Sequence, residues 1–93
     1  MIRNVVYQGQ KIGYIEYTVQ HTLEGMSIYI DYLYLHEQFR GKGLFKHLFK
    51  TMINIGKRRR IHIFYLIPID DRLYELYQRY GFVGEHGLMR LTV

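Results

Sequence analysis

A chain of 93 residues, 48% of them hydrophobic, has the size of one compact domain and is too apolar to be disordered. It contains no cysteine, which excludes disulfides, thiolate metal sites and a cysteine nucleophile. Thirteen Lys and Arg against eight Asp and Glu give a net charge of +5. The cations concentrate between Arg40 and Arg60, a segment without acids, which indicates an anionic partner such as a phosphate.

No apolar run approaches the roughly 20 residues that span a bilayer. Met1–Gln10 also lacks the apolar core of a signal peptide. We therefore expect a single cytoplasmic domain over residues 1–93, with no membrane partner.

The first third of the chain predicts three strands. Ile2–Tyr7 and Ile12–Gln20 are β-prone runs on either side of a turn at residues 8–11, which is typical of a hairpin. After a second turn at residues 21–25, Met26–Leu35 alternates again. We predict that this third strand is central in the sheet.

The alternation of the third strand assigns its side chains to two faces. One face is predicted to hold Ile28, Ile30, Tyr32 and Tyr34. The other is predicted to hold Tyr29, Asp31, Leu33 and Leu35. Because both faces are largely apolar or aromatic, we expect this strand to be covered on both sides.

From Leu44 the apolar period becomes helical. The apolar stripe consists of Leu44, Leu48, Met52 and Ile55. Gly56, followed by the basic run Lys57–Arg60, suits the C-terminus of this helix. We favour a solvated helix end for the basic run over a nucleic-acid patch.

The last third predicts a buried strand over Ile61–Ile67, a helix over Arg72–Tyr80 and a closing hairpin over Val83–Val93. Asp70 or Asp71 is expected to cap the helix. The order β-β-β-α-β-α-β, with room for one more strand, predicts an α/β fold of the mixed-sheet (α+β) kind. Its strand-helix-strand passage predicts a crossover between parallel strands.

The most informative segment is Gln38–Leu44, between the central strand and the first helix. Its glycines allow close approach to a ligand, and the free amides of the helix start bind pyrophosphate well. Arg40, Lys42 and Lys46 add positive charge there. The spacing is neither that of a Walker loop nor that of a dinucleotide fingerprint, and an ordinary glycine-bearing turn is the alternative.

This segment resembles the acetyl-CoA-binding motif of the GNAT N-acetyltransferase superfamily, Gln/Arg-x-x-Gly-x-Gly/Ala, at Gln38, Gly41 and Gly43. A second stretch, Leu76–Phe82, is similar to the Leu-Tyr-x-x-x-Gly-Phe signature of the family. The resemblance implies a GNAT-like fold. It also implies an enzyme that transfers an acetyl group from acetyl-CoA to a primary amine of a protein or small molecule by direct attack.

The resemblance also implies roles for individual residues. The backbone of Leu33, Tyr34 and Leu35 would pair with the pantetheine arm of acetyl-CoA. The amides that would hold the pyrophosphate are those of Arg40, Gly41, Lys42, Gly43, Leu44 and Phe45. Tyr77 would be the general acid that protonates the departing thiolate. At two positions where the family commonly has Asn and a small residue, this chain has Asp70 and Leu73. We still expect Asp70 to contact the cofactor.

The attacking amine must lose a proton, so the reaction needs a base. Asp31 is the best candidate because of its place on the central strand, and Glu16, Glu37 and His36 are weaker ones. For Asp31 the alternative is a structural acid paired with Arg or Tyr. For Tyr77 the alternative is a core tyrosine on an amphipathic helix.

The histidines at positions 21, 36, 47, 62 and 86 show no paired ligand spacing, so we expect no metal. Members of the family usually begin with a strand and two helices that form one wall of the acceptor site, and this chain is expected to lack them. Three hypotheses follow. The acceptor site is open, a second copy of the chain supplies the wall in a homodimer, or activity is lost. In the last case the chain is a basic module that contacts nucleic acid or a protein.

Overall fold

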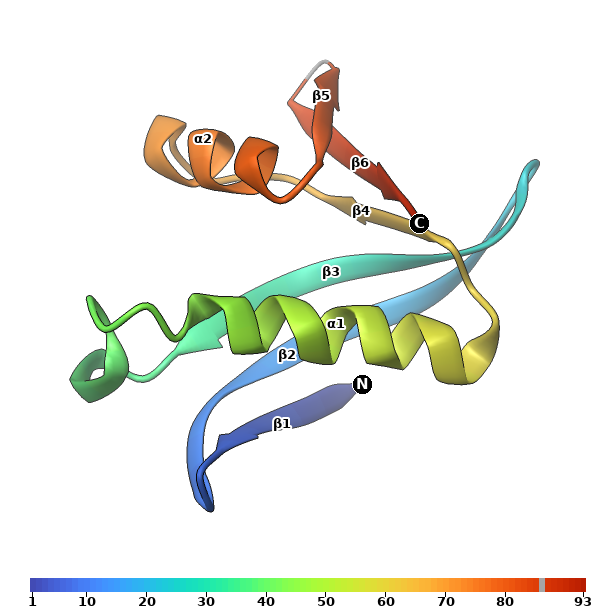
Figure 1. Cartoon of the computed structure of the whole chain (residues 1–93). Helices are drawn as coiled ribbons and strands as arrows, with labels where there is room; N and C mark the ends of the chain where they lie inside the picture. The colour runs from blue at the N-terminus through green and yellow to red at the C-terminus, as the bar shows by residue number, and fades with distance from the viewer. Residues whose placement is uncertain (86) are drawn as a thin grey trace.

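The computed structural model describes residues 1–85 and 87–93. Within them, six strands form one mixed sheet in the order β1-β2-β3-β4-β6-β5, with two helices beside it (Figure 1). In chain order the elements are β1 (Ile2–Tyr7), β2 (Gln10–Thr22), β3 (Gly25–Leu35), a 3-10 turn (Glu37–Phe39), α1 (Phe45–Arg59), β4 (Ile63–Leu66), α2 (Asp71–Arg79), β5 (Val83–Glu85) and β6 (Leu88–Thr92). The predicted fold class and element order are confirmed, and the closing hairpin adds one strand. Its expected apex, His86, lies outside the described residues.

The pairing of β3 with β4 positions the candidate site. β1 and β2 are antiparallel, as are β2 and β3, whereas β3 and β4 are parallel, as the crossover through α1 predicts. The parallel pairing involves only Ile28 with Phe64 and Tyr29 with Tyr65. Beyond Tyr29 the two strands diverge, and Figure 1 shows the widening gap between their ribbons.

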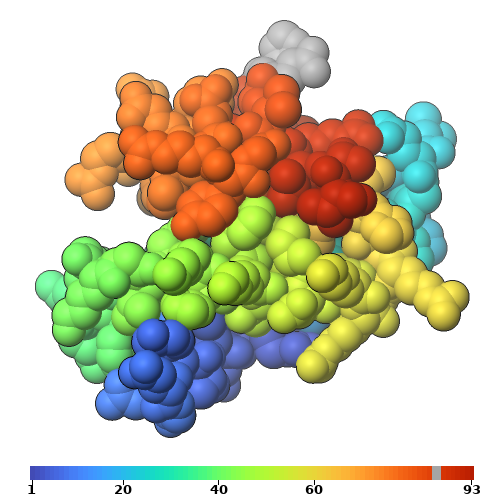
Figure 2. All heavy atoms as spheres, viewed as in Figure 1, coloured from blue at the N-terminus to red at the C-terminus, as the bar shows by residue number. Residues whose placement is uncertain are grey.

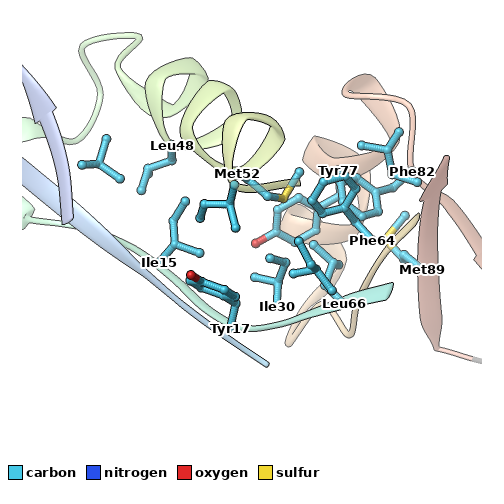
Figure 3. Close-up of a cluster of buried hydrophobic side chains, with 14 of the residues drawn as sticks. Ile15, Tyr17, Ile30, Leu48, Met52, Phe64, Leu66, Tyr77, Phe82 and Met89 are labelled. Atoms are coloured by element: carbon cyan, nitrogen blue, oxygen red, sulfur yellow. The ribbon is translucent and has the colours of Figure 1, made fainter. Parts of the chain in front are cut away.

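The core lies between α1 and the sheet. The apolar stripe of α1 faces inward, so that Leu48, Met52 and Ile55 are buried. They belong to a cluster that includes the fully buried Ile15 and Phe64 (Figure 3). The helical period in the sequence therefore predicts the buried face of α1 correctly.

The basic run Lys57–Arg60 forms the C-terminus of the first helix as predicted, but Gly56 lies inside the helix. α1 continues through Gly56 to Arg59, and Arg60 ends it with a left-handed backbone at φ +57°. Gly56 is buried, and a Cβ there would come within 2.8 Å of the Ile61 carbonyl oxygen and would overlap the Phe64 ring. Glycine is needed here for close packing of α1 on β4.

The predicted faces of β3 are wrong beyond Ile30. The register with β2 passes from Ile30 directly to Tyr32, which leaves Asp31 as a β-bulge. A bulge reverses the alternation of the strand beyond it. The face toward α1 consequently holds Ile28, Ile30, Leu33 and Leu35, and the opposite face holds Tyr32 and Tyr34. The expected cover on both sides is found at Ser27 and Ile28, which are both fully buried, but is wrong in the C-terminal half, where Tyr32 is 47% exposed.

Candidate active site

A cleft of about 380 Å³ lies where β3 and β4 diverge. The C-terminal half of β3 forms one wall, and the segment after β4 together with α2 forms the other. Figure 2 shows an indentation at the edge of the molecule between α2 and the loop before α1. The cleft exists because β3 loses its β4 partner after Tyr29.

The cleft brings together about half of the residues predicted from the sequence. Those that line it are Asp31, Leu33, Tyr34, Leu35, Arg40, Phe45 and Tyr77. The others lie in neighbouring segments. Gln38 is in the 3-10 turn, Gly41, Lys42, Gly43 and Leu44 form the loop before α1, and Asp70 precedes α2.

The loop before α1 leaves several backbone amides unengaged. Gly41 and Gly43 have φ values of +73° and +72°, which side chains rarely adopt, and nothing lies within 4 Å of a Cβ built on either. Among the described residues, no amide from Gly41 to Lys46 donates to a backbone carbonyl. Leu44 provides no side-chain cap, and the first turn of α1 has no acid. These amides and the helix dipole are therefore suited to an anion.

Arg40 folds back onto the end of β3. Its Nε donates to the Leu35 carbonyl oxygen at 2.8 Å, and its guanidinium lies 5.2 Å from the centroid of the Tyr34 ring. The Arg40 amide donates to the carbonyl of Glu37. Both groups are thus engaged within the chain, and a role for Arg40 in pyrophosphate binding stays a prediction.

Tyr77 belongs both to the core and to the cleft. Its side chain is only 7% exposed and packs against Phe82, with the ring centroids 5.8 Å apart (Figure 3). It also packs against Phe45, whose ring centroid lies 6.1 Å away. Burial, and to a smaller extent the negative charge of Asp70, raises the pKa of Tyr77 to about 12. The phenol therefore stays protonated at neutral pH and can act as a donor toward the cleft.

Asp31 lies at the bulge and is exposed on the β3 wall of the cleft. The Thr18 hydroxyl donates to its Oδ2 at 2.8 Å. Within residues 1–85 and 87–93, the hydrogen-bond partner of Asp31 is Thr18, and not an Arg or Tyr as the structural alternative required. Asp31 is thus accessible to a cationic or proton-bearing ligand in the cleft.

Two parts of the cleft were not predicted from the sequence. Ile67, Pro68 and Ile69 follow β4, and Ile69 is 82% exposed at the wall of the cleft. Apolar residues on both sides of the proline, directly after a strand-forming run, are the sequence signal that could have identified this wall. Arg72, Leu73 and Leu76 on α2 complete it.

Two further properties of the described part of the chain bear on the expected partners. No group of three or more His, Asp or Glu that could hold a metal ion occurs there. No helix among these residues is long and apolar enough to span a bilayer.

The sequence profile of the acetyltransferase (GNAT) family matches residues 1–82. No curated protein matches the chain in sequence. A GNAT family acetyltransferase from Elizabethkingia anophelis, solved with acetyl-CoA bound, is 17% identical with a TM-score of 0.72; the match covers 99% of this chain and 75% of that one. Ard1 from Thermoplasma volcanium is 19% identical with a TM-score of 0.73, over 92% of this chain and 66% of that one.

The NatC complex bound to Gag peptide and CoA is similar to a comparable degree, with 19% identity and a TM-score of 0.75. The match covers 89% of this chain and 62% of that one. At such identities the likeness to solved structures shows a shared fold.

Proposed function

The chain belongs to the GNAT family of acetyltransferases, and on that premise we propose that it is an N-acetyltransferase. It transfers the acetyl group of acetyl-CoA to a primary amine of a protein or small molecule. The observation that carries the proposal is a single cleft lined by Asp31 on β3 and by Tyr77 on α2. The free amides at the start of α1 lie between Arg40 and Phe45, which both line the cleft.

The exposed edge of β3 suits the pantetheine arm. After Tyr29 this edge has no strand partner within the described residues, so the backbone of Leu33, Tyr34 and Leu35 can pair with the amides of an extended ligand. The Arg40 side chain must leave the Leu35 carbonyl if that carbonyl accepts a bond from the ligand.

The loop before α1 suits the pyrophosphate. The unengaged amides from Gly41 to Phe45 can donate to phosphate oxygens, and the exposed Lys42 and Lys46 add positive charge. Glycine at positions 41 and 43 keeps this approach free of side chains.

The reaction requires a base and an acid. Acetyl-CoA supplies a thioester whose carbonyl carbon is attacked by the amine nitrogen; the C–N bond forms, the C–S bond breaks, and the thiolate takes up a proton. Asp31 accepts the proton that the amine loses, directly or through water. Tyr77 donates a hydrogen bond to the sulfur as negative charge develops there; its proton passes to the thiolate, and the tyrosinate takes up a proton from water. A thiol has a pKa of about 8.5, well below that of Tyr77, so full transfer of the phenol proton is unfavourable. Most of the contribution of Tyr77 to the rate therefore comes from its hydrogen bond to the sulfur.

Calorimetric titration with acetyl-CoA tests the cofactor site. Gly41→Asp places a negative charge beside the proposed pyrophosphate position, so we expect affinity to fall by at least about tenfold. Gly9→Asp is the matched control, because Gly9 has a similar φ of +77° and open space but lies in the β1–β2 turn. Absence of binding to the folded wild-type protein at millimolar acetyl-CoA contradicts the proposal, as does equal affinity of the two variants.

Turnover tests the role of Tyr77. Thiol release is measured with a panel of primary amines for the wild type and Tyr77→Phe. We expect Tyr77→Phe to lower kcat by about 10²-fold or more, with the Kd for acetyl-CoA unchanged. An unchanged kcat would remove Tyr77 from the mechanism and leave the cofactor site intact.

A further inference from the structure

Three tyrosines extend the β3 wall of the cleft onto β2, on the face of the sheet opposite α1. The tyrosine cluster consists of Tyr14, Tyr32 and Tyr34, whose ring centroids lie 5.2 to 6.2 Å apart. Tyr32 and Tyr34 line the cleft, and Tyr14 pairs in register with Tyr34. The cluster is accessible, since Tyr32 is 47% exposed.

One end of the cluster, where Tyr14 and Tyr34 are register partners, already holds cations of the chain itself. The guanidinium of Arg40 lies 5.2 Å from the centroid of Tyr34, and the Lys11 ammonium lies 5.9 Å from that of Tyr14. Aromatic faces attract such groups through their negative electrostatic potential. Within the described residues, no Lys or Arg lies over Tyr32 in this way, so its face is open to an external cation.

Two carboxylates flank Tyr32. Glu16 is its register partner on β2, and Asp31 immediately precedes it at the bulge. Both side chains are exposed, and in the part of the chain that the structure describes neither forms an ion pair. An aromatic face between two unpaired carboxylates is complementary in charge to an ammonium group.

We propose, on the basis of the proposed function, that the acceptor is a linear diamine or polyamine. The reacting nitrogen lies at Asp31, and a second ammonium lies over Tyr32 beside Glu16. Asp31 and Tyr32 are consecutive residues with Cα atoms about 3.8 Å apart, so the two nitrogen positions lie close together and suit a short spacer of about three to four carbons. Lys11 and Arg40 lie over Tyr14 and its register partner Tyr34, and would repel a basic peptide that ran along the cluster in that direction, whereas a short amine ends before them.

The binding test uses the complex of the protein with CoA. Because CoA carries no acetyl group, the amine is not acetylated during the titration. NMR titration compares 1,4-diaminobutane with butylamine, which has the same carbon chain but one charge. We expect the diamine to bind at least about tenfold more tightly, with the largest shifts at Tyr32 and Glu16. Equal affinity of the two amines overturns the inference, as does tighter binding of a lysine-containing peptide.

Variants separate the contributions of ring and charge. Tyr32→Leu and Glu16→Gln should each reduce the preference for the diamine severalfold, and Tyr32→Phe should keep it because the aromatic face remains. Glu75→Gln is the charge-matched control, because Glu75 is exposed on α2 outside the cleft lining. A preference that survives both Tyr32→Leu and Glu16→Gln overturns the assignment.

Kinetics with acetyl-CoA then distinguish this inference from the proposed function. Acetylation of both amines with equal kcat/KM overturns the diamine preference and leaves the N-acetyltransferase intact. Selective diamine binding without acetylation of any amine supports the binding site and contradicts the proposed function.

Discussion

From Gly25 to Ile30, β3 pairs with β2 on one side and meets β4 on the other, and Ile28 and Ile30 are buried. From Tyr32 to Leu35 it pairs, among the described residues, with β2 alone, and the side chains from Asp31 onward are exposed or half-buried. The bulge at Asp31 marks the boundary between the two halves. One continuous strand therefore supplies both the core and the wall of the cleft.

The difference lies in the neighbour and not in the apolar content of the strand. Leu33 and Leu35 are as apolar as Ile28 and Ile30, yet they are only partly buried, since no strand continues beside them on the β4 side within the described residues. A strand edge that loses its partner keeps its backbone groups available to a ligand. Substitutions around the first half should thus act on stability, and those in the second half on binding.

The largest expected effect is that of Phe64→Ala, opposite Ile28 in the first half. Phe64 is fully buried, so its truncation should lower the free energy of unfolding by about 3–5 kcal/mol. Tyr32→Leu, in the second half, should change it by less than about 0.5 kcal/mol. Urea denaturation followed by circular dichroism measures both, and equal losses would erase the distinction between the halves.

Tyr77 sharpens the comparison because it lines the cleft but is buried like a core residue. The pKa of Tyr77 is raised to about 12 in the folded protein, whereas a tyrosine in the unfolded chain has a pKa of about 10. The folded state therefore binds more protons between these values, so its stability is fully present below pH 10 and declines as pH rises toward 12. The loss amounts to roughly 3 kcal/mol at most.

Urea unfolding of the wild type and Tyr77→Phe between pH 9 and 11.5 measures this loss. Phenylalanine has no proton to lose, so the stability difference between the two proteins should change with pH in this window. Parallel curves would show that burial does not shift the titration of Tyr77.

The smallest expected effect concerns Asp70, whose Oδ1 accepts a hydrogen bond from the Leu73 amide at 2.8 Å and caps α2. Asp70→Ala should cost about 1 kcal/mol of stability, whereas Asp70→Asn keeps the cap and should cost a few tenths at most. Calorimetry on Asp70→Asn then tests the predicted cofactor contact. A Kd for acetyl-CoA equal to that of the wild type would leave Asp70 with the capping role alone.

Local patterns in the sequence predict much of the fold. The period of three to four residues identifies the buried face of α1, and Asp70 and Gly81 delimit α2 as capping chemistry predicts. The bulge at Asp31 was missed because strict alternation assumes an unbroken register, and the register depends on pairing with β2. The role of Gly56 was missed because the close approach of Phe64 is a tertiary contact.

The candidate site is predictable only where a local motif encodes it. Gly41 and Gly43 are identifiable from their spacing, and Tyr77 from the signature around it. The tyrosine cluster is not, because Tyr14 meets Tyr34 through the register of two strands. The depth of the cleft also depends on where β3 and β4 diverge, which no local pattern specifies.

Amide hydrogen exchange with and without acetyl-CoA tests the central claim most directly. We predict that acetyl-CoA slows exchange at Leu33–Leu35 and at Gly41–Phe45, and leaves the paired amides of Ile28 and Tyr29 unchanged. Protection confined to another surface, such as the basic run Lys57–Arg60, would contradict this account. So would unchanged exchange at saturating acetyl-CoA.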